Sequence, residues 1–127
     1  MTGFVANIEK LTLDNKNFRK VLFTGQHAQL VLMSLKPKEE IGFEVHEIAD
    51  QFIRVEAGEG TVIMNGEKSD ITDGSAFIVP AGVRHNVINK STTADLKLYT
   101  LYSPPHHRDG TIHKTKKDAE KDKEDHI

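Results

Sequence analysis

Four polar side chains of this 127-residue chain have the types and spacing that metal chemistry needs, namely Glu44, His46, Gln51 and His85. The chain contains no cysteine, which excludes disulfides, thiolate nucleophiles, iron–sulfur clusters and cysteine-bound zinc. Any metal ion must therefore be held by histidine nitrogen, carboxylate oxygen or amide oxygen, and these four residues offer all three kinds of donor.

Glu44 and His46 are two positions apart, so on a β-strand their side chains point to the same face. Residues 47–50 are enough for a hairpin connection, and Gln51 then begins a returning strand roughly opposite His46, within about 5 Å across the ladder. One hairpin would bring these three potential ligands together. Asp50 has the opposite parity from Gln51, and we interpret it as a turn residue rather than a ligand.

Side-chain alternation along the strand that begins at Gln51 sets the expected register. With Gln51 pointing inward, Ile53 and Val55 also point inward, whereas the outward positions are Phe52, Arg54 and Glu56. This register keeps the charged residues outside and gives the site an apolar wall. We expect the pocket beside the site to be lined by Ile53, Val55, Met64 and Phe77.

His85 follows the turn residues 80–84 and begins another predicted strand. A single histidine in a strand is more often a hydrogen-bonded residue than a metal ligand. Its position alone therefore does not assign it to the site.

The elements that must position these residues are short strands between about residues 19 and 103. Asn65-Gly66 is the strongest turn signal, because a two-residue type I′ hairpin needs positive φ at both central positions. No apolar stripe of helical period continues over several turns. The pattern predicts an all-β sandwich or barrel, with strands at 21–23, 30–33, 52–55, 62–64, 75–79 and 96–102.

The chain has the length of one domain, and its formal net charge is -2. This balance indicates neither a nucleic-acid partner nor an anionic membrane. The N-terminus lacks the pattern of a signal peptide, and no apolar stretch is long enough to span a bilayer. We therefore expect a cytoplasmic protein.

The last residues, 104–127, are expected to form a loop and a charged tail. Residues 103–113 contain His106, His107 and His113, and either fold back over the barrel mouth or form a polar surface loop held by prolines. Residues 114–127 are almost entirely charged, which is typical of a short solvated helix or of a disordered tail.

The segment from residue 74 to residue 89 resembles the second motif of the cupin superfamily, with its defining residues at Gly74, Pro80, Gly82, His85 and Asn89. Residues 38–58 resemble the first cupin motif, which closes at Gly58. The resemblance extends over about residues 20–103 and implies a small single-domain cupin β-barrel, a double-stranded β-helix of jelly-roll type. The C-terminal end is similar to small cupins often labelled mannose-6-phosphate isomerase-like.

The resemblance also implies one divalent metal ion inside the barrel. The usual cupin ligands are a His-x-His pair, a Glu on the next strand and the His of the second motif. His46 and His85 match two of these positions, Glu44 replaces the first His, and Gln51 replaces the Glu. One carboxylate and three neutral donors are thereby kept. Lys38 stands where the first motif opens with Gly. Some small cupins that act on uronate-derived sugars are similar in placing Gln at the third position.

Two histidines and one carboxylate are also the composition of a non-haem iron site, and the same set suits Zn, Fe, Mn, Ni or Co. The resemblance predicts a metal-binding cupin that acts on a small polar molecule in the barrel pocket. The reaction would be that of an isomerase or lyase on a sugar-like substrate, or that of a non-haem dioxygenase. No independent acid–base pair is visible, so an uncoordinated Glu44 or a histidine at the barrel mouth would have to serve as the catalytic group.

Two other interpretations are open. The barrel could bind a small molecule without turnover, or Glu44 and Gln51 could form hydrogen bonds inside a cupin without a metal. Cupins of similar size often pair as homodimers through the outer sheet and exchanged N-terminal strands. Residues 1–18 are the candidates for such an exchange.

Overall fold

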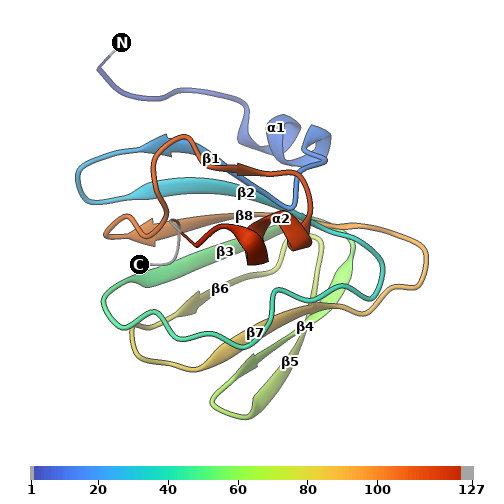
Figure 1. Cartoon of the computed structure of the whole chain (residues 1–127). Coiled ribbons are helices and arrows are strands. Elements are labelled where there is room, and N and C mark those ends of the chain that lie inside the picture. Colours follow the sequence, from blue (N-terminus) through green and yellow to red (C-terminus); the bar gives the residue numbers. More distant parts are fainter. Residues whose placement is uncertain (1, 124–127) are drawn as a thin grey trace.

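The computed structural model of the chain describes residues 2–123, and its strands form two antiparallel sheets that lie against each other (Figure 1). The larger sheet has the order β6-β3-β8-β2-β1-β9, and the smaller has the order β5-β4-β7. This confirms the all-β jelly-roll prediction. The strands are β1 (Arg19–Thr24), β2 (Gln29–Leu35), β3 (Asp50–Ala57), β4 (Glu59–Met64), β5 (Glu67–Thr72), β6 (Ala76–Val79), β7 (His85–Asn89), β8 (Leu96–Ser103) and β9 (Ile112–His113).

The core lies between the two sheets and uses inward-facing side chains from both. Ile53 and Val55 of β3 are completely buried, as the predicted register requires. Val62 of β4 and Val87 of β7 contribute from the smaller sheet. Burying one such aliphatic side chain stabilises a fold by about 1.5–3 kcal/mol, so this core fixes how the two sheets face each other.

The outward register of β3 is confirmed by an ion pair between Arg54 and Glu56, whose Nε and Oε1 atoms are 3.5 Å apart. Glu56 is nevertheless buried, with 8% of its surface exposed. The pairing between β3 and β8 shifts between Val55 and Ala57. An outward position on this sheet is therefore not the same as an exposed one.

Two turns explain the glycines that the sequence analysis singled out. Asn65 and Gly66 have φ angles of +48° and +85° and join β4 to β5, which confirms the predicted hairpin. Gly58 has a φ of +97°, and a Cβ there would meet the Asp95 carbonyl oxygen at 2.6 Å. A larger residue cannot fit at Gly58 without moving the chain.

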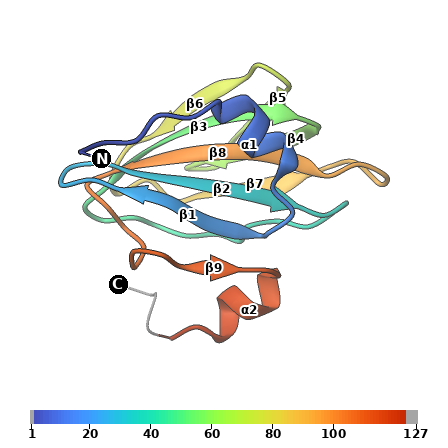
Figure 2. The same cartoon turned by 90° about the horizontal axis from the view of Figure 1, so that it is seen from above.

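The N-terminal segment contains a helix, α1 (Ile8–Asp14), which begins at Asn7 with its side chain accepting a hydrogen bond from the Lys10 N–H. Figure 2 shows α1 crossing the outside of the larger sheet over β2, β8 and β3. Residues 8–14 are therefore helical rather than extended. The exchange of residues before Arg19 between two copies stays a prediction.

The C-terminal segment extends the larger sheet, which the sequence did not predict. β9 pairs with β1 through Arg19–His113 and Lys20–Ile112, and α2 (Lys116–Lys121) follows it. A short helix was one of the two structures expected for residues 114–127, and α2 is such a helix. Residues 124–127 lie outside the described part of the chain. Across residues 2–123, no helix has the length and apolar character to cross a membrane.

Candidate metal centre

Three side chains converge inside the barrel: Glu44, His46 and His85. Their potential ligand atoms all lie within 4.8 Å of one another. Glu44 Oε1 is 3.2 Å from His46 Nε2 and 3.7 Å from His85 Nε2. Both histidines are buried, whereas the Glu44 side chain keeps 31% of its surface exposed. A carboxylate and two imidazoles therefore face one small space that opens toward solvent.

The segment that carries Glu44 and His46 pairs with β7, which corrects the hairpin predicted from the sequence. Glu44 and His85 exchange backbone hydrogen bonds of 2.9 and 3.0 Å, and Glu40 forms a bridge to Ile88. β3, which carries Gln51, pairs instead with β6 and β8. The site is therefore assembled across the two sheets, and direct pairing with β7 brings Glu44 to His85.

The turn before β7 and the first residues of β7 hold this segment in place. The Gly82 N–H donates a hydrogen bond of 2.9 Å to the His46 carbonyl. Asn86, which is 1% exposed, accepts from the Gly42 N–H and donates to Glu40. Asn89 donates to the carbonyls of residues 35, 36 and 94. Gly82 and Asn89, the glycine and asparagine of the second motif, thus hold the segment at His46 and the neighbouring loops in place.

The hydrogen bonds of His85 fix its tautomer. Its Nδ1 is 2.9 Å from the Val83 carbonyl oxygen, and a carbonyl can only accept, so Nδ1 carries the proton. The Nε2 of the neutral ring therefore presents a lone pair, and this buried atom has no hydrogen-bond partner among the described residues. It faces Glu44 Oε1, which also presents lone pairs. A cation between the two atoms resolves this arrangement.

Burial by itself raises the pKa of the Glu44 carboxyl. The hydrogen bond and charge of the neighbouring His46 are the leading effects that outweigh burial and hold this pKa well below its usual range. Glu44 is therefore ionised at neutral pH. Together with the buried Nε2 of His85, this charged donor fits a divalent cation.

Gln51 is 1% exposed and points into the interior of the barrel. Its Nε2 donates to Thr100 Oγ1 at 3.0 Å and to the Tyr102 hydroxyl at 3.2 Å. Its Oε1 is buried without a hydrogen-bond partner among the described residues. The Tyr102 ring lies 5.4 Å from the His46 ring, so Gln51 and His46 are linked through one side chain. An amide oxygen is the atom that a metal ion would use, and it is the atom left available.

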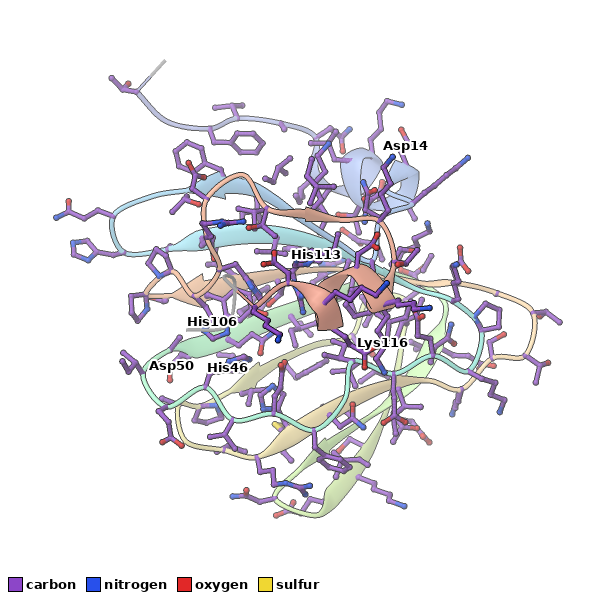
Figure 3. All side chains as sticks on the ribbon, viewed as in Figure 1. Asp14, His46, Asp50, His106, His113 and Lys116 are labelled. Carbon is purple, nitrogen blue, oxygen red and sulfur yellow. The ribbon has the colours of Figure 1, made fainter. Side chains whose placement is uncertain are left out.

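The segment after β8 turns back over the site, which decides between the two expectations for residues 103–113. The His106 ring packs edge-on against the His46 ring at a centroid distance of 4.2 Å. Figure 3 shows His46 and His106 at the same end of the molecule. Gln29, which is fully buried, holds this segment. Its Oε1 accepts from the N–H groups of His106 and His107, and its Nε2 donates to the His107 carbonyl.

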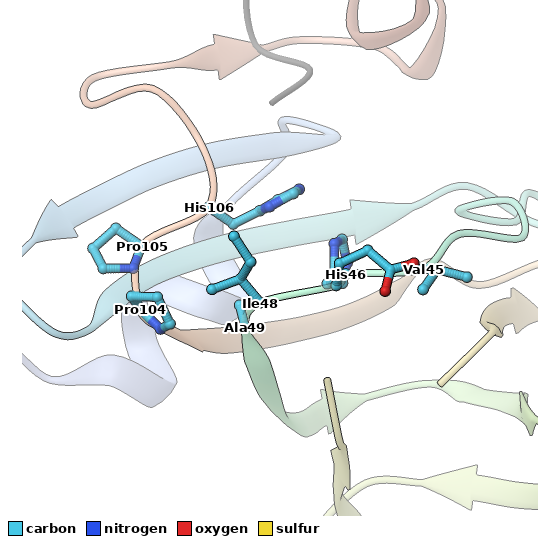
Figure 4. Close-up of a pocket in the computed structure, with 8 residues that line it drawn as sticks. Val45, His46, Ile48, Ala49, Pro104, Pro105 and His106 are labelled. Carbon is cyan, nitrogen blue, oxygen red and sulfur yellow. The ribbon is translucent and has the colours of Figure 1, made fainter. Parts of the chain in front are cut away.

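A cavity of about 240 Å³ opens beside His46 (Figure 4). Its apolar wall is formed by Val45, Ile48, Ala49, Pro104 and Pro105. Its polar lining is formed by His46, Glu47 and His106. His46 thus belongs both to the three-residue cluster and to the cavity.

The four predicted pocket residues lie elsewhere. Ile53 and Val55 are fully buried in the core, and Met64 and Phe77 pack against that core. They do not line the described cavity, and their contact with a bound molecule stays a prediction. Asp50 is the first residue of β3 and pairs with Ser103, rather than lying in a turn as predicted; it is exposed, and its Oδ1 accepts a hydrogen bond from the Ala81 N–H.

The other two C-terminal histidines have different surroundings. His107 is buried, and its Nε2 is 3.3 Å from the Tyr102 hydroxyl. His113 lies between Arg19, 3.3 Å from its Nδ1, and Asp122, 2.9 Å from its Nε2. His113 therefore joins β9 to β1 and to the end of α2, and it is not part of the cavity wall.

Sequence reasoning missed Tyr102, Gln29 and Asn86. Tyr102 occupies an inward position of β8. The sequence could have indicated this, because Tyr102 is an even number of positions from the apolar residues Leu96 and Leu98 and therefore shares their face of the strand. Gln29 begins β2, but its partners are backbone atoms 77 and 78 positions away. No local pattern reports such contacts.

The comparisons with known proteins agree with this geometry. The cupin domain family matches residues 31–102. The chain is 49% identical over 122 residues to the uncharacterized protein YrkC of Bacillus subtilis (strain 168), covering 91% of this chain and 65% of YrkC, so it spans about two thirds of that relative's length.

Two solved structures are similar in fold. The crystal structure of BH2720 from Bacillus halodurans is 46% identical with a TM-score of 0.89 and covers 92% of each chain. KdgF from Halomonas sp. is 26% identical with a TM-score of 0.64, covering 72% of this chain and 79% of that one. Given the family match, the shared jelly-roll and the convergent Glu44, His46 and His85, this chain belongs to the cupin family.

Proposed function

We propose that the barrel binds one divalent metal ion through Glu44, His46, Gln51 and His85, and that this centre acts on a small molecule in the adjoining cavity. The observation that carries the proposal is the buried Nε2 of His85, which lacks a hydrogen-bond partner among the described residues and faces the ionised Glu44 at 3.7 Å. Gln51 Oε1 is a second buried atom that lacks a hydrogen-bond partner among the described residues. Two such atoms are costly unless a cation accepts their lone pairs.

The donor set suits Zn, Fe, Mn, Ni or Co, and such an ion supplies Lewis acidity toward a carbonyl or enediol oxygen. The chain's own contribution is to hold the donors and to orient the substrate. Tyr102 and Thr100 fix the amide of Gln51, and the Val83 carbonyl fixes the ring of His85. These contacts orient the ligands before any ion arrives.

His106 supplies the proton-transfer group that the donor set lacks. Its ring lies against His46 and lines the cavity, so a substrate held there comes within reach of an imidazole. Imidazole can hold or give a proton near neutral pH. A positioned acid–base group favours isomerase or lyase chemistry beside a carbonyl over oxidative cleavage. Dioxygenase chemistry is the second candidate, because two histidines and one carboxylate also suit non-haem iron.

The first test is the metal content of the purified protein after reconstitution, measured by elemental analysis. We expect about one ion per chain for wild type and for His27→Ala, which removes an exposed histidine. Glu44→Ala, His46→Ala and His85→Ala should lose most of that metal. Wild-type protein that carries no stoichiometric metal would contradict the proposal, and Gln51→Ala protein with unchanged affinity would remove Gln51 from the ligand set.

The second test separates the reaction classes. An isomerase or lyase should exchange substrate hydrogen with solvent or release product without consuming oxygen, and His106→Phe should abolish this while keeping the metal. A dioxygenase should consume oxygen in step with substrate. A barrel that only binds its ligand should show ligand-dependent thermal stabilisation without product.

A further inference from the structure

The cavity beside His46 has few groups that could pair with a charged or polyhydroxylated ligand. Its apolar wall consists of Val45, Ile48, Ala49 and two prolines. Among the described residues that line it there is no lysine or arginine, and Glu47 is its one carboxylate. Hydrogen-bonding capacity is concentrated at His46 and His106, at the end of the cavity next to the metal centre.

Charge balance sets a limit on the ligand. A divalent ion and the ionised Glu44 leave one net positive charge, since the other proposed donors are neutral. One ionised oxygen on the ligand balances that charge. A second anionic group would lie against an apolar wall beside Glu47, where its loss of hydration would not be compensated. A sugar ring would leave most of its hydroxyls without partners for the same reason.

From these two observations we propose that the cavity selects a compact oxygen chelator with a single ionisable group and an apolar body, and that it discriminates against sugars and ligands with a second anionic group. Enolisable diketones and hydroxypyranones belong to this chemical class. The inference rests on the proposed metal centre and narrows the substrate, replacing the sugar-like molecule expected from the sequence.

Ile48 is the residue through which to test this selectivity. It lines the cavity and is 81% exposed, so a lysine there adds a cation at the rim without disturbing the core. Ile78 of β6 offers a matched control, because it is 59% exposed and does not line the cavity. Ile78→Lys therefore adds the same charge to the protein at a different place.

The probes are allomaltol and comenic acid, which share a hydroxypyranone ring and its chelating oxygens. They differ at one ring carbon, which carries a methyl group in allomaltol and a carboxylate in comenic acid. Cobalt-loaded protein is titrated with each probe, and binding is followed in the visible spectrum of the protein-bound cobalt. Each affinity is divided by the affinity of the same probe for free cobalt, so that the ratio measures the contribution of the cavity to binding.

We expect wild type and Ile78→Lys to prefer allomaltol by about tenfold, and Ile48→Lys to reduce that preference to about threefold or less. A wild-type protein that binds comenic acid as tightly as allomaltol overturns the inference, and so does an equal change in both lysine variants. Cobalt stoichiometry is measured before any probe is added. Protein that binds no cobalt contradicts the metal centre itself, whereas bound cobalt with the wrong preference contradicts only the inference about the ligand.

Discussion

Glu44 is partly buried between two buried histidines, with 31% of its side-chain surface exposed, and it is ionised. Burial raises the pKa of its carboxyl, and the hydrogen bond and charge of His46 are the leading effects that reverse this rise. In the metal-free protein this carboxylate contacts His46 Nε2 at 3.2 Å and faces His85 Nε2 at 3.7 Å. An arriving cation would replace those contacts and would release no proton from Glu44.

The first prediction concerns acid stability of the metal-free protein. A carboxyl whose pKa is lowered by folding stabilises the protein above its unfolded pKa of about 4.3, and this contribution is lost as the pH falls through the folded pKa. Because the pKa of Glu44 is lowered, wild type should exceed Glu44→Gln in free energy of unfolding at pH 5–6 by about 1 kcal/mol. The difference should shrink below about pH 4.

Urea denaturation of chelator-treated protein at a series of pH values measures this difference. Glu47→Gln, at an exposed position three residues further along, is the matched control, because Glu47 forms no ion pair among the described residues. If the gap between wild type and Glu44→Gln stays constant down to pH 2, the carboxylate does not stabilise the fold in the way the geometry indicates.

A second prediction concerns the donor at position 51. Gln51→Glu replaces an amide oxygen with a charged one, and Thr100 and Tyr102 carry hydroxyls that can donate to it. Metal affinity should rise by about tenfold, which corresponds to about 1.4 kcal/mol. Competition with a chelating dye measures the change. Gln26→Glu adds the same charge in the exposed β1–β2 turn, and an equal gain there would mean that net charge rather than ligation is responsible.

At the scale of the elements, the connection after β8 is as important to the site as any strand. Gln29 at the start of β2 binds the backbone of residues 106 and 107, and this contact sets His106 against His46. The cavity therefore depends on a hydrogen-bonded amide that is not one of the proposed metal donors.

The third prediction follows from that separation. Gln29→Leu should lower the free energy of unfolding by about 2–3 kcal/mol, because it leaves several buried polar groups without partners. It should increase amide hydrogen exchange at His106 and His107 and abolish probe binding in the cavity, while metal content stays near wild type. Gln26→Leu, in the same turn region but exposed, should change none of these. Loss of metal together with the loop would show that the two parts are not independent.

The strands could be predicted from the sequence wherever apolar residues lie between glycine and proline turns. β1, β2, β3, β4, β6 and β8 were expected within a few residues of their bounds. β5 was not named, because four of its six residues are exposed polar ones in succession and only Ile71 is buried. β9 has two residues, too few for any pattern.

The site was predictable only in part, for a related reason. His46, His85 and Glu44 were identified from motif spacing and are brought together. The predicted pairing partner of the segment that carries Glu44 was wrong. This segment pairs with β7, some forty residues further along the chain, and local hairpin geometry cannot predict a pairing over that separation. Whether His106 reaches the pocket could not be predicted from the sequence. Its position depends on a hydrogen bond to Gln29, and these two residues are far apart in the sequence.

At the scale of the whole molecule, the proposed metal centre lies between the two sheets. Glu44 and His85 belong to the part built on β7, and Gln51 belongs to β3 in the larger sheet. An ion bound by all of them would join the sheets directly. Binding to the folded state alone also stabilises the protein by mass action.

The fourth prediction is a metal-dependent shift in thermal stability. At a free metal concentration of 100 times Kd the gain is about 2.7 kcal/mol, or roughly 10 °C for a domain of this size. Wild type and His27→Ala should lose this increment on addition of a chelator, as measured by differential scanning calorimetry. His85→Ala should melt at the same temperature with and without metal. A chelator effect that persists in His85→Ala would place the responsible ion elsewhere.

The hydrogen bonds of Gln29 affect which substitutions the segment after β8 could accept. Its contacts at residues 106 and 107 are made to backbone atoms, so they do not depend on which side chains those residues carry. Side chains at residues 104–106 face the cavity and can be exchanged while the segment stays in place. If the proposed metal centre is correct, a library randomised at these three positions should yield folded, metal-loaded proteins with different ligand preferences.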